Sequence, residues 1–171
     1  MIAALLIAAI SAGTWTVDAS QSTLRYQVTH KLHLVTADSH EVEGKAVVKP
    51  DGSVLTEIRA PISSFKSSDG NRDEHMTEAL DVGRFPMVVF KGLAHVGGAP
   101  VQLQGQVELH GVKKAYPVSM EVTPQPDGTL RVKGAFDVSL KAHEIEPPSL
   151  LFIEIDDACH IEVDLTMRAA K

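Results

Sequence analysis

Val-Gln-Leu-Gln-Gly-Gln-Val-Glu-Leu-His-Gly, at residues 101–111, alternates apolar and polar side chains along almost its whole length. A β-strand points successive side chains to opposite faces, so this stretch predicts a strand with one buried face and one solvent-exposed face. The same pattern recurs over most of the chain. We therefore predict an all-β protein in which one face of a large sheet is buried.

Similar alternation marks the other expected strands. They cover residues 15–17, 24–30 (with 32–36 as a continuation through a bend), 42–48, 58–62, 86–90, 101–110, 116–122, 130–140 and 158–168, and the stretch at 150–153 is continuously apolar. Connections in the second half of the chain are hairpin length, so neighbouring strands should be antiparallel. Eight long strands in up-and-down order predict an eight-stranded antiparallel, lipocalin-like barrel, wide enough to be filled or to hold one small ligand.

One short helix is expected near residues 71–82. Asn71 can cap its N-terminus, with Glu74 reaching back as in a capping box. Gly83 can end it in the left-handed conformation. A narrow apolar stripe at helical spacing is formed by Met76, Ala79 and Leu80.

The composition fits a single globular domain: 171 residues, 44% hydrophobic, 22% charged and a net charge of −6. This acidic balance excludes the basic surface of a nucleic-acid-binding protein. Aromatic residues make up only 5%, so the interior is mainly aliphatic. The single cysteine, Cys159, has no partner for an internal disulfide and is expected to be a small core residue.

Residues 1–12 are wholly apolar and end in small side chains. They are too short to span a bilayer, so no integral membrane span is expected. We interpret them as a signal peptide that lacks its positive start, which predicts a periplasmic or secreted protein. A buried N-terminal strand or helix is the alternative.

Several inward positions carry very small residues: Gly44, Ala46, Ala60, Gly105 and Gly134. They allow two interpretations, bends that let long strands coil or gaps that line a central tunnel. An aliphatic tunnel suits a hydrocarbon chain, because each buried methylene contributes about 0.8 kcal/mol.

Three segments resemble the YceI-like family. They are Trp15-Thr-Val-Asp18 with Ser22 and 24–30, then residues 71–92, then His110-Gly-Val-Lys113. The resemblance covers residues 14–168 and implies a YceI-like barrel domain over residues 14–170. It further implies a lengthwise hydrophobic channel for a polyisoprenoid or another long-chain amphipathic lipid, with no cofactor apart from that ligand.

We accordingly expect the inward side chains to contact a lipid: Tyr26, Val28, His30, Ala46, Val88, Phe90, Leu103, Gly105, Val107, Met120, Gly134, Phe136 and Val138. The helix is expected near the barrel mouth, where Arg72, His75 and Met76 would lie. His30, His33 and His40 lack the spacing of a zinc site, so no metal is predicted.

The leading hypothesis is a non-catalytic protein that binds, sequesters or transports a long-chain lipid. One alternative is an enzyme acting on a lipid-like substrate, with His30 or His75 as base. Another is a stress-related interaction protein with a solid barrel. No nucleophile elbow and no phosphate loop are present. The sequence is compatible with a homodimer and does not identify the lipid headgroup.

Overall fold

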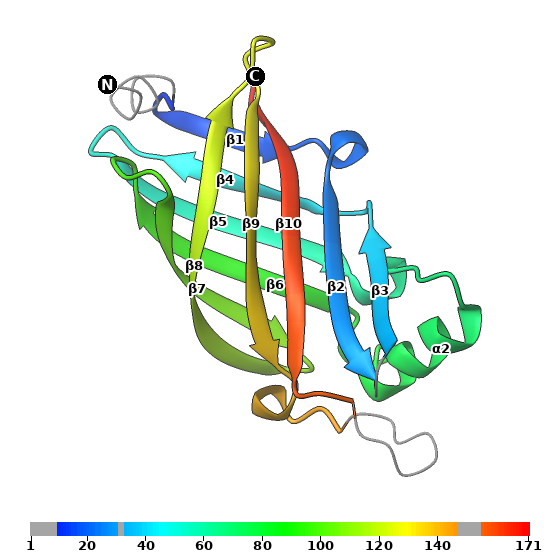
Figure 1. Cartoon of the computed structure of the whole chain (residues 1–171). Coiled ribbons are helices and arrows are strands. Elements are labelled where there is room, and N and C mark those ends of the chain that lie inside the picture. The colour runs from blue at the N-terminus through cyan, green and yellow to red at the C-terminus, as the bar shows by residue number, and fades with distance from the viewer. Residues whose placement is uncertain (1–9, 31–32, 147–154) are drawn as a thin grey trace.

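The computed structural model of the chain describes residues 10–30, 33–146 and 155–171. These ranges are mainly β-structure, as the alternating sequence predicts (Figure 1). The strands are β1 (Gly13–Val17), β2 (Thr23–His30), β3 (His33–Ser39), β4 (Glu43–Val48), β5 (Ser53–Pro61), β6 (Met87–His95), β7 (Val101–Leu109), β8 (Val112–Pro124), β9 (Leu130–Ser139) and β10 (Ala158–Ala169). The helix is α2 (Gly70–Ala79), and the short 3-10 helices are η1 (Ala19–Gln21), η2 (Ile62–Ser64) and η3 (Lys141–His143).

Eight of the described strands form a closed antiparallel ring. Its order is β1-β4-β5-β6-β7-β8-β9-β10, and β1 pairs with β10 to close it. The predicted eight-stranded antiparallel barrel is therefore confirmed. The strands β2 and β3 form a hairpin that continues the sheet beyond the ring, because β2 pairs with β10. Across this hairpin, Arg25 donates two hydrogen bonds of 2.6 and 2.8 Å to Asp38.

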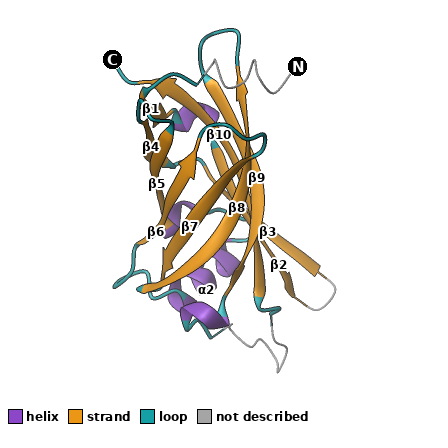
Figure 2. Cartoon of the chain, turned by 90° about the vertical axis from the view of Figure 1, so that its left-hand side faces the viewer, coloured by secondary structure: helices purple, strands orange, loops and turns teal. Residues whose placement is uncertain are grey.

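The long strand β10 holds the ring together by pairing with both β1 and β2. Its residues 167–169 pair with β1, and its residues 160–164 pair with β2. The chain bends between β1 and β2 at η1, so the two strands follow one another along the same edge of β10. This bend separates the closed part of the barrel from the splayed hairpin (Figure 2).

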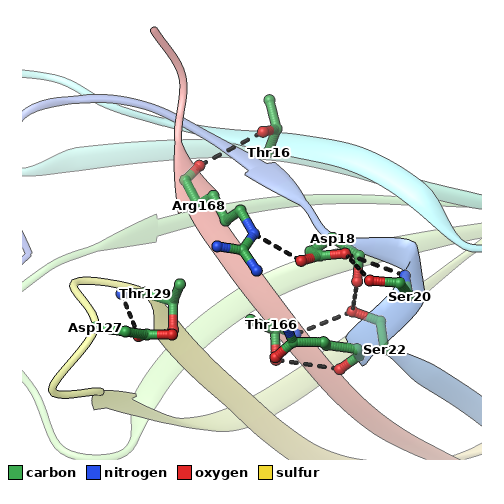
Figure 3. Close-up of polar contacts among 9 residues, drawn as sticks. Thr16, Asp18, Ser20, Ser22, Asp127, Thr129, Thr166 and Arg168 are labelled. Carbon is green, nitrogen blue, oxygen red and sulfur yellow. Dashed lines mark hydrogen bonds and ion pairs between the residues drawn. The ribbon is translucent and has the colours of Figure 1, made fainter.

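A polar network stabilises the bend beside β10 (Figure 3). Ser22 Oγ accepts a 3.0 Å hydrogen bond from the Thr166 amide and donates one of 2.7 Å to the Asp18 carbonyl oxygen. Arg168 Nε donates to Asp18 Oδ2 at 2.6 Å. The hydrogen bonds from Ser20 and Arg168 lower the pKa of the Asp18 carboxyl. The network supplies partners for backbone groups that a continuous β-ladder would otherwise satisfy.

The alternation at residues 101–111 places one face of β7 inside the barrel and the other face in solvent, as predicted. In β7, Leu103 and Val107 face the barrel interior, and the glutamines between them are exposed. Buried side chains form two clusters inside the barrel. One cluster surrounds Trp15 and Met167 at the end that carries both termini, and the other surrounds Leu24 and Phe65 nearer α2.

The helix lies where it was predicted, but two details of its ends differ. Asp69, and not Asn71, is the N-cap: its Oδ1 accepts hydrogen bonds from the amides of residues 71 and 72. At the other end, Asp81 takes the left-handed conformation with φ of 47°, whereas Gly83 does not. Carboxylate side chains cap helices as well as carboxamides do, so composition alone does not favour Asn71 over Asp69. The Asp69 carboxylate is the one that reaches the first helical amides.

Some predictions fall on residues that the structure does not describe. The continuously apolar stretch at 150–153 lies outside the described residues, as do residues 1–9 of the segment interpreted as a signal peptide. Of that segment, Ile10 packs against the Trp15 cluster, and the Ser11 carbonyl oxygen accepts a 3.3 Å hydrogen bond from the Trp15 indole.

Candidate functional site

Two cavities occupy the interior, and they meet end to end. The first, here called the barrel cavity, measures about 200 Å³ and runs inside the ring of strands. The second, the helix cavity, measures about 210 Å³ and lies between α2 and the β2–β3 hairpin. The residues that line both are Phe65, Val88, Leu109, Cys159 and Ile161. Taken together the cavities reach the size range of small-molecule sites, roughly 300–1,000 Å³.

The barrel cavity is almost wholly aliphatic and aromatic. Each strand of the ring contributes inward side chains because its alternation places every second residue inside. Among the described lining residues, the hydroxyl and charged side chains are those of Thr56 and Arg59. Arg59 turns its guanidinium outward, where Nε lies 2.7 Å from the Glu43 carboxylate. The cavity therefore offers an apolar surface with scarcely any hydrogen-bonding partner.

Most of the residues predicted to contact a lipid line one of the two cavities. The barrel cavity is lined by Ala46, Val88, Phe90, Leu103, Val107, Met120, Phe136 and Val138 from the predicted set. The helix cavity is lined by Tyr26, Val28, His30, Val88, Arg72, His75 and Met76. The helix thus lies at the end of the barrel interior, as expected.

The predicted glycines do not line either cavity among the described residues. A methyl group added to Gly105 would lie 2.5 Å from Phe90 Cε2 and 2.6 Å from the Tyr116 carbonyl oxygen. One added to Gly134 would collide with Met120 Sδ. Neighbouring side chains fill these gaps, so the glycines make room for Phe90 and Met120 and do not open a tunnel. A bulky substitution at Gly105 would test packing and not channel access.

Within the described residues, the helix cavity contains one buried ring nitrogen without a partner, on His30. Its ring lines the cavity, and Nε2 is closed off from solvent with no hydrogen-bond partner within the described residues. Tyr26 lines the same cavity, and burial raises the pKa of its phenol to about 12, so the hydroxyl keeps its proton at neutral pH. On α2, Arg72 and His75 lie 3.5 Å from Asp69 and Glu78, respectively.

Cys159 lies where the two cavities meet. It is a buried free thiol on β10, in agreement with the predicted core position. Burial raises the pKa of this thiol to about 12. Since the thiolate is the nucleophilic form, Cys159 is poorly suited to covalent catalysis at neutral pH.

A buried histidine that the sequence did not single out closes the barrel beside β8. His143, in η3, is completely enclosed, and its Nδ1–H donates to the Val112 carbonyl oxygen at 3.0 Å. Its Nε2 accepts a 3.0 Å hydrogen bond from the Tyr116 hydroxyl, whose oxygen accepts another from the Ser139 amide at 3.2 Å. Burial lowers the pKa of His143, which therefore stays neutral at pH 7.

Ile145 is one of several lining residues outside the predicted set. It is buried and lines the helix cavity. In the sequence it is recognisable only as a single large aliphatic side chain within a charged and proline-containing stretch.

Comparison with known proteins identifies the family. The YceI-like domain family matches residues 15–167 of this chain. The chain belongs to the YceI-like family. A search of curated proteins found no match.

Solved structures share the YceI-like fold at low sequence identity. A polyisoprenoid-binding domain from Saccharophagus degradans has a TM-score of 0.74 and 15% identity, covering 91% of this chain and 98% of its own. BcnA from Burkholderia cenocepacia has a TM-score of 0.73 and 18% identity, covering 88% and 98%. The YCEI protein from Campylobacter jejuni has a TM-score of 0.62 and 12% identity, covering 84% of each chain.

The described part of this YceI-like chain contains neither a cluster of metal ligands nor a membrane-spanning helix. No three His, Cys, Asp or Glu side chains converge there into a group that could hold a metal ion. None of the helices within the described ranges has the length and apolar character needed to cross a membrane.

Proposed function

We propose that this protein binds a long-chain isoprenoid or a similar amphipathic lipid inside the barrel, without catalysis, to sequester or carry it. The observation that supports this proposal is the apolar lining of the barrel cavity, continuous with the helix cavity. Burial in such a cavity stabilises each methylene of a ligand by about 0.8 kcal/mol before ordering costs. The name of the Saccharophagus degradans neighbour, a polyisoprenoid-binding domain, points to the same ligand class.

The alternatives have less support. A solid barrel is at odds with cavities of about 200 and 210 Å³. An enzyme with His30 or His75 as base would also need a nucleophile, and the Cys159 thiol stays protonated because burial raises its pKa to about 12. We further propose that residues 1–12 direct export and that the mature protein works outside the cytoplasm, which N-terminal sequencing of the exported protein would test.

The proposal is tested first by extraction. Protein purified from its native source is extracted with organic solvent, and the extract is analysed by mass spectrometry. We expect a lipid with a long apolar chain at close to one molecule per protein. Repeated preparations without lipid, together with no binding of fluorescent long-chain probes to the extracted protein, would contradict the proposal.

A filled cavity provides the second test. Ala46 on β4 lines the barrel cavity, so Ala46→Phe places a ring in the space that the lipid would occupy. Ala135→Phe is the matched control, because Ala135 on β9 is exposed on the outer face. We expect Ala46→Phe to weaken probe binding at least about tenfold while the control binds as wild type, since a tenfold change needs only 1.4 kcal/mol. Equal binding by the two variants would place the ligand elsewhere.

A further inference from the structure

The two ends of the interior differ in chemistry. The barrel cavity presents methyl, methylene and aromatic groups, whereas the helix cavity also contains hydrogen-bonding side chains. Among the described lining residues of the helix cavity, these are Tyr26, His30, Arg72 and His75. An amphipathic molecule therefore has one favourable orientation, with its tail in the ring of strands and its polar end beside α2.

His30 carries a polar atom that lacks a partner. Nε2 is enclosed and makes no hydrogen bond within the described residues. Leaving such an atom unsatisfied is unfavourable, and a residue that stays in this state calls for an explanation. An oxygen atom of a ligand beside this ring would supply the missing acceptor.

The charges around the helix cavity favour a neutral ligand end. Arg72 Nε lies 3.5 Å from Asp69 Oδ2, and His75 Nδ1 lies 3.5 Å from Glu78 Oε2. Each basic side chain of the helix therefore already has an acidic neighbour. An anionic headgroup would have to compete with these carboxylates, whereas a neutral oxygen needs only a hydrogen-bond donor.

We propose that the helix cavity is the headgroup site and that it selects a lipid ending in an uncharged oxygen acceptor, a hydroxyl or a carbonyl. His30 Nε2–H donates to that oxygen, and Tyr26 lies on the same side of the cavity. The proposal rests on the proposed lipid-binding function and adds the orientation of the lipid and the chemistry of its polar end.

Three probes with the same chain test the headgroup. They are geranylgeraniol, its monophosphate, and the hydrocarbon that has the same branched, unsaturated chain but lacks the hydroxyl, each added to delipidated protein and measured by competition with a fluorescent long-chain probe. We expect the alcohol to bind about 5- to 10-fold more tightly than the hydrocarbon, the gain of one buried hydrogen bond. Tighter binding of the monophosphate than of the alcohol would overturn the choice of an uncharged headgroup.

Variants of His30 assign the contact. His30→Phe keeps a ring and removes the donor, His30→Gln restores an N–H donor, and His33→Phe is the control because His33 is exposed on the next strand. We expect His30→Phe to bind the alcohol and the hydrocarbon equally, and His30→Gln to recover part of the preference. His33→Phe should behave as wild type.

Stability without ligand provides an independent readout. Since His30→Phe removes an unsatisfied buried atom, we expect the melting temperature of the delipidated protein to rise while alcohol binding falls. A fall in melting temperature would indicate that Nε2 has a structural partner, and it would overturn the proposal.

If wild type binds the alcohol and the hydrocarbon equally, the headgroup site is wrong but lipid binding stands. If wild type binds none of the three probes, the proposed function itself fails.

Discussion

His143 shows how one buried side chain can fix a protonation state. Its Nδ1–H donates to a backbone carbonyl, and its Nε2 accepts from the Tyr116 hydroxyl. Both ring nitrogens are engaged in the neutral form, and protonation would leave two donors facing each other at Nε2. Burial lowers the pKa of His143 because desolvation penalises the charged ring, and this outweighs the hydrogen bond to the Val112 carbonyl oxygen, which acts in the opposite direction.

The pH dependence of stability should reflect this histidine. An unperturbed histidine has a pKa near 6.5, so below about pH 6.5 the unfolded chain binds a proton that the folded protein does not. The unfolding free energy should therefore fall as pH decreases below about 6.5, and level off below the lowered pKa of the folded state. Each unit by which folding lowers the pKa of His143 adds about 1.4 kcal/mol to the unfolding free energy at neutral pH.

Urea unfolding of wild type and His143→Gln at pH 7 and pH 5 measures this contribution. Glutamine does not titrate, so we expect a smaller loss of stability between the two pH values in the variant, although it is less stable at pH 7. The same pH-dependent loss in both proteins would show that His143 is not responsible. His33→Gln is a suitable control because His33 is exposed on β3.

At the scale of the element, α2 depends on its cap more than on its packing. No side chain of the helix is fully buried, and Met76 is the helix residue that packs against the Leu24–Phe65 cluster. Asp69 Oδ1 accepts hydrogen bonds of 3.0 and 3.4 Å from the first helical amides. The carboxylate also interacts favourably with the N-terminal end of the helix dipole.

Removing the cap should loosen the helix over the cavity. We expect Asp69→Ala to destabilise α2 by about 1 kcal/mol and to lower the hydrogen-exchange protection of its amides about fivefold. Asn71→Ala, the alternative cap suggested by the sequence, should leave that protection close to wild type. If Asn71→Ala has the larger effect, the assignment of Asp69 as N-cap is incorrect.

At the scale of the whole molecule, the seam between β10 and the first two strands determines whether the ring is closed. Ser22 is buried, and its hydroxyl links the Thr166 amide of β10 to the Asp18 carbonyl oxygen at the bend. Without this hydroxyl, the Thr166 amide would lose its partner, whereas the Asp18 carbonyl oxygen would keep the 3.1 Å hydrogen bond from the Gln21 amide.

Ser22→Ala should therefore destabilise the fold by about 1–3 kcal/mol, the effect of leaving buried polar groups unpaired. Ser119→Ala is the control, because Ser119 on β8 is exposed and bonds only to the Gln102 side chain. Its effect should stay within about 0.5 kcal/mol. Urea denaturation at pH 7 compares the two, and an equal loss in both would argue against the role of the seam.

The alternating sequence was sufficient to predict the barrel and many of the side chains that line it. Period-two patterning decides which side chains face inward, so Leu103 and Phe136 could be placed without a structure. Gly105 could not be interpreted the same way, because Phe90 from the neighbouring strand fills its gap. His143 was missed because its partners, Val112 and Tyr116, lie 31 and 27 residues away in the sequence.

The position of β10 also has a consequence for how the protein is made. The ring closes only when residues 158–169 meet β9 on one side and both β1 and β2 on the other. During synthesis, the edges of β9, β1 and β2 therefore stay open until residues 158–169 have emerged. Open edges invite pairing with other chains, and contacts between distant residues form slowly. We infer that a holding chaperone benefits this protein most in that interval.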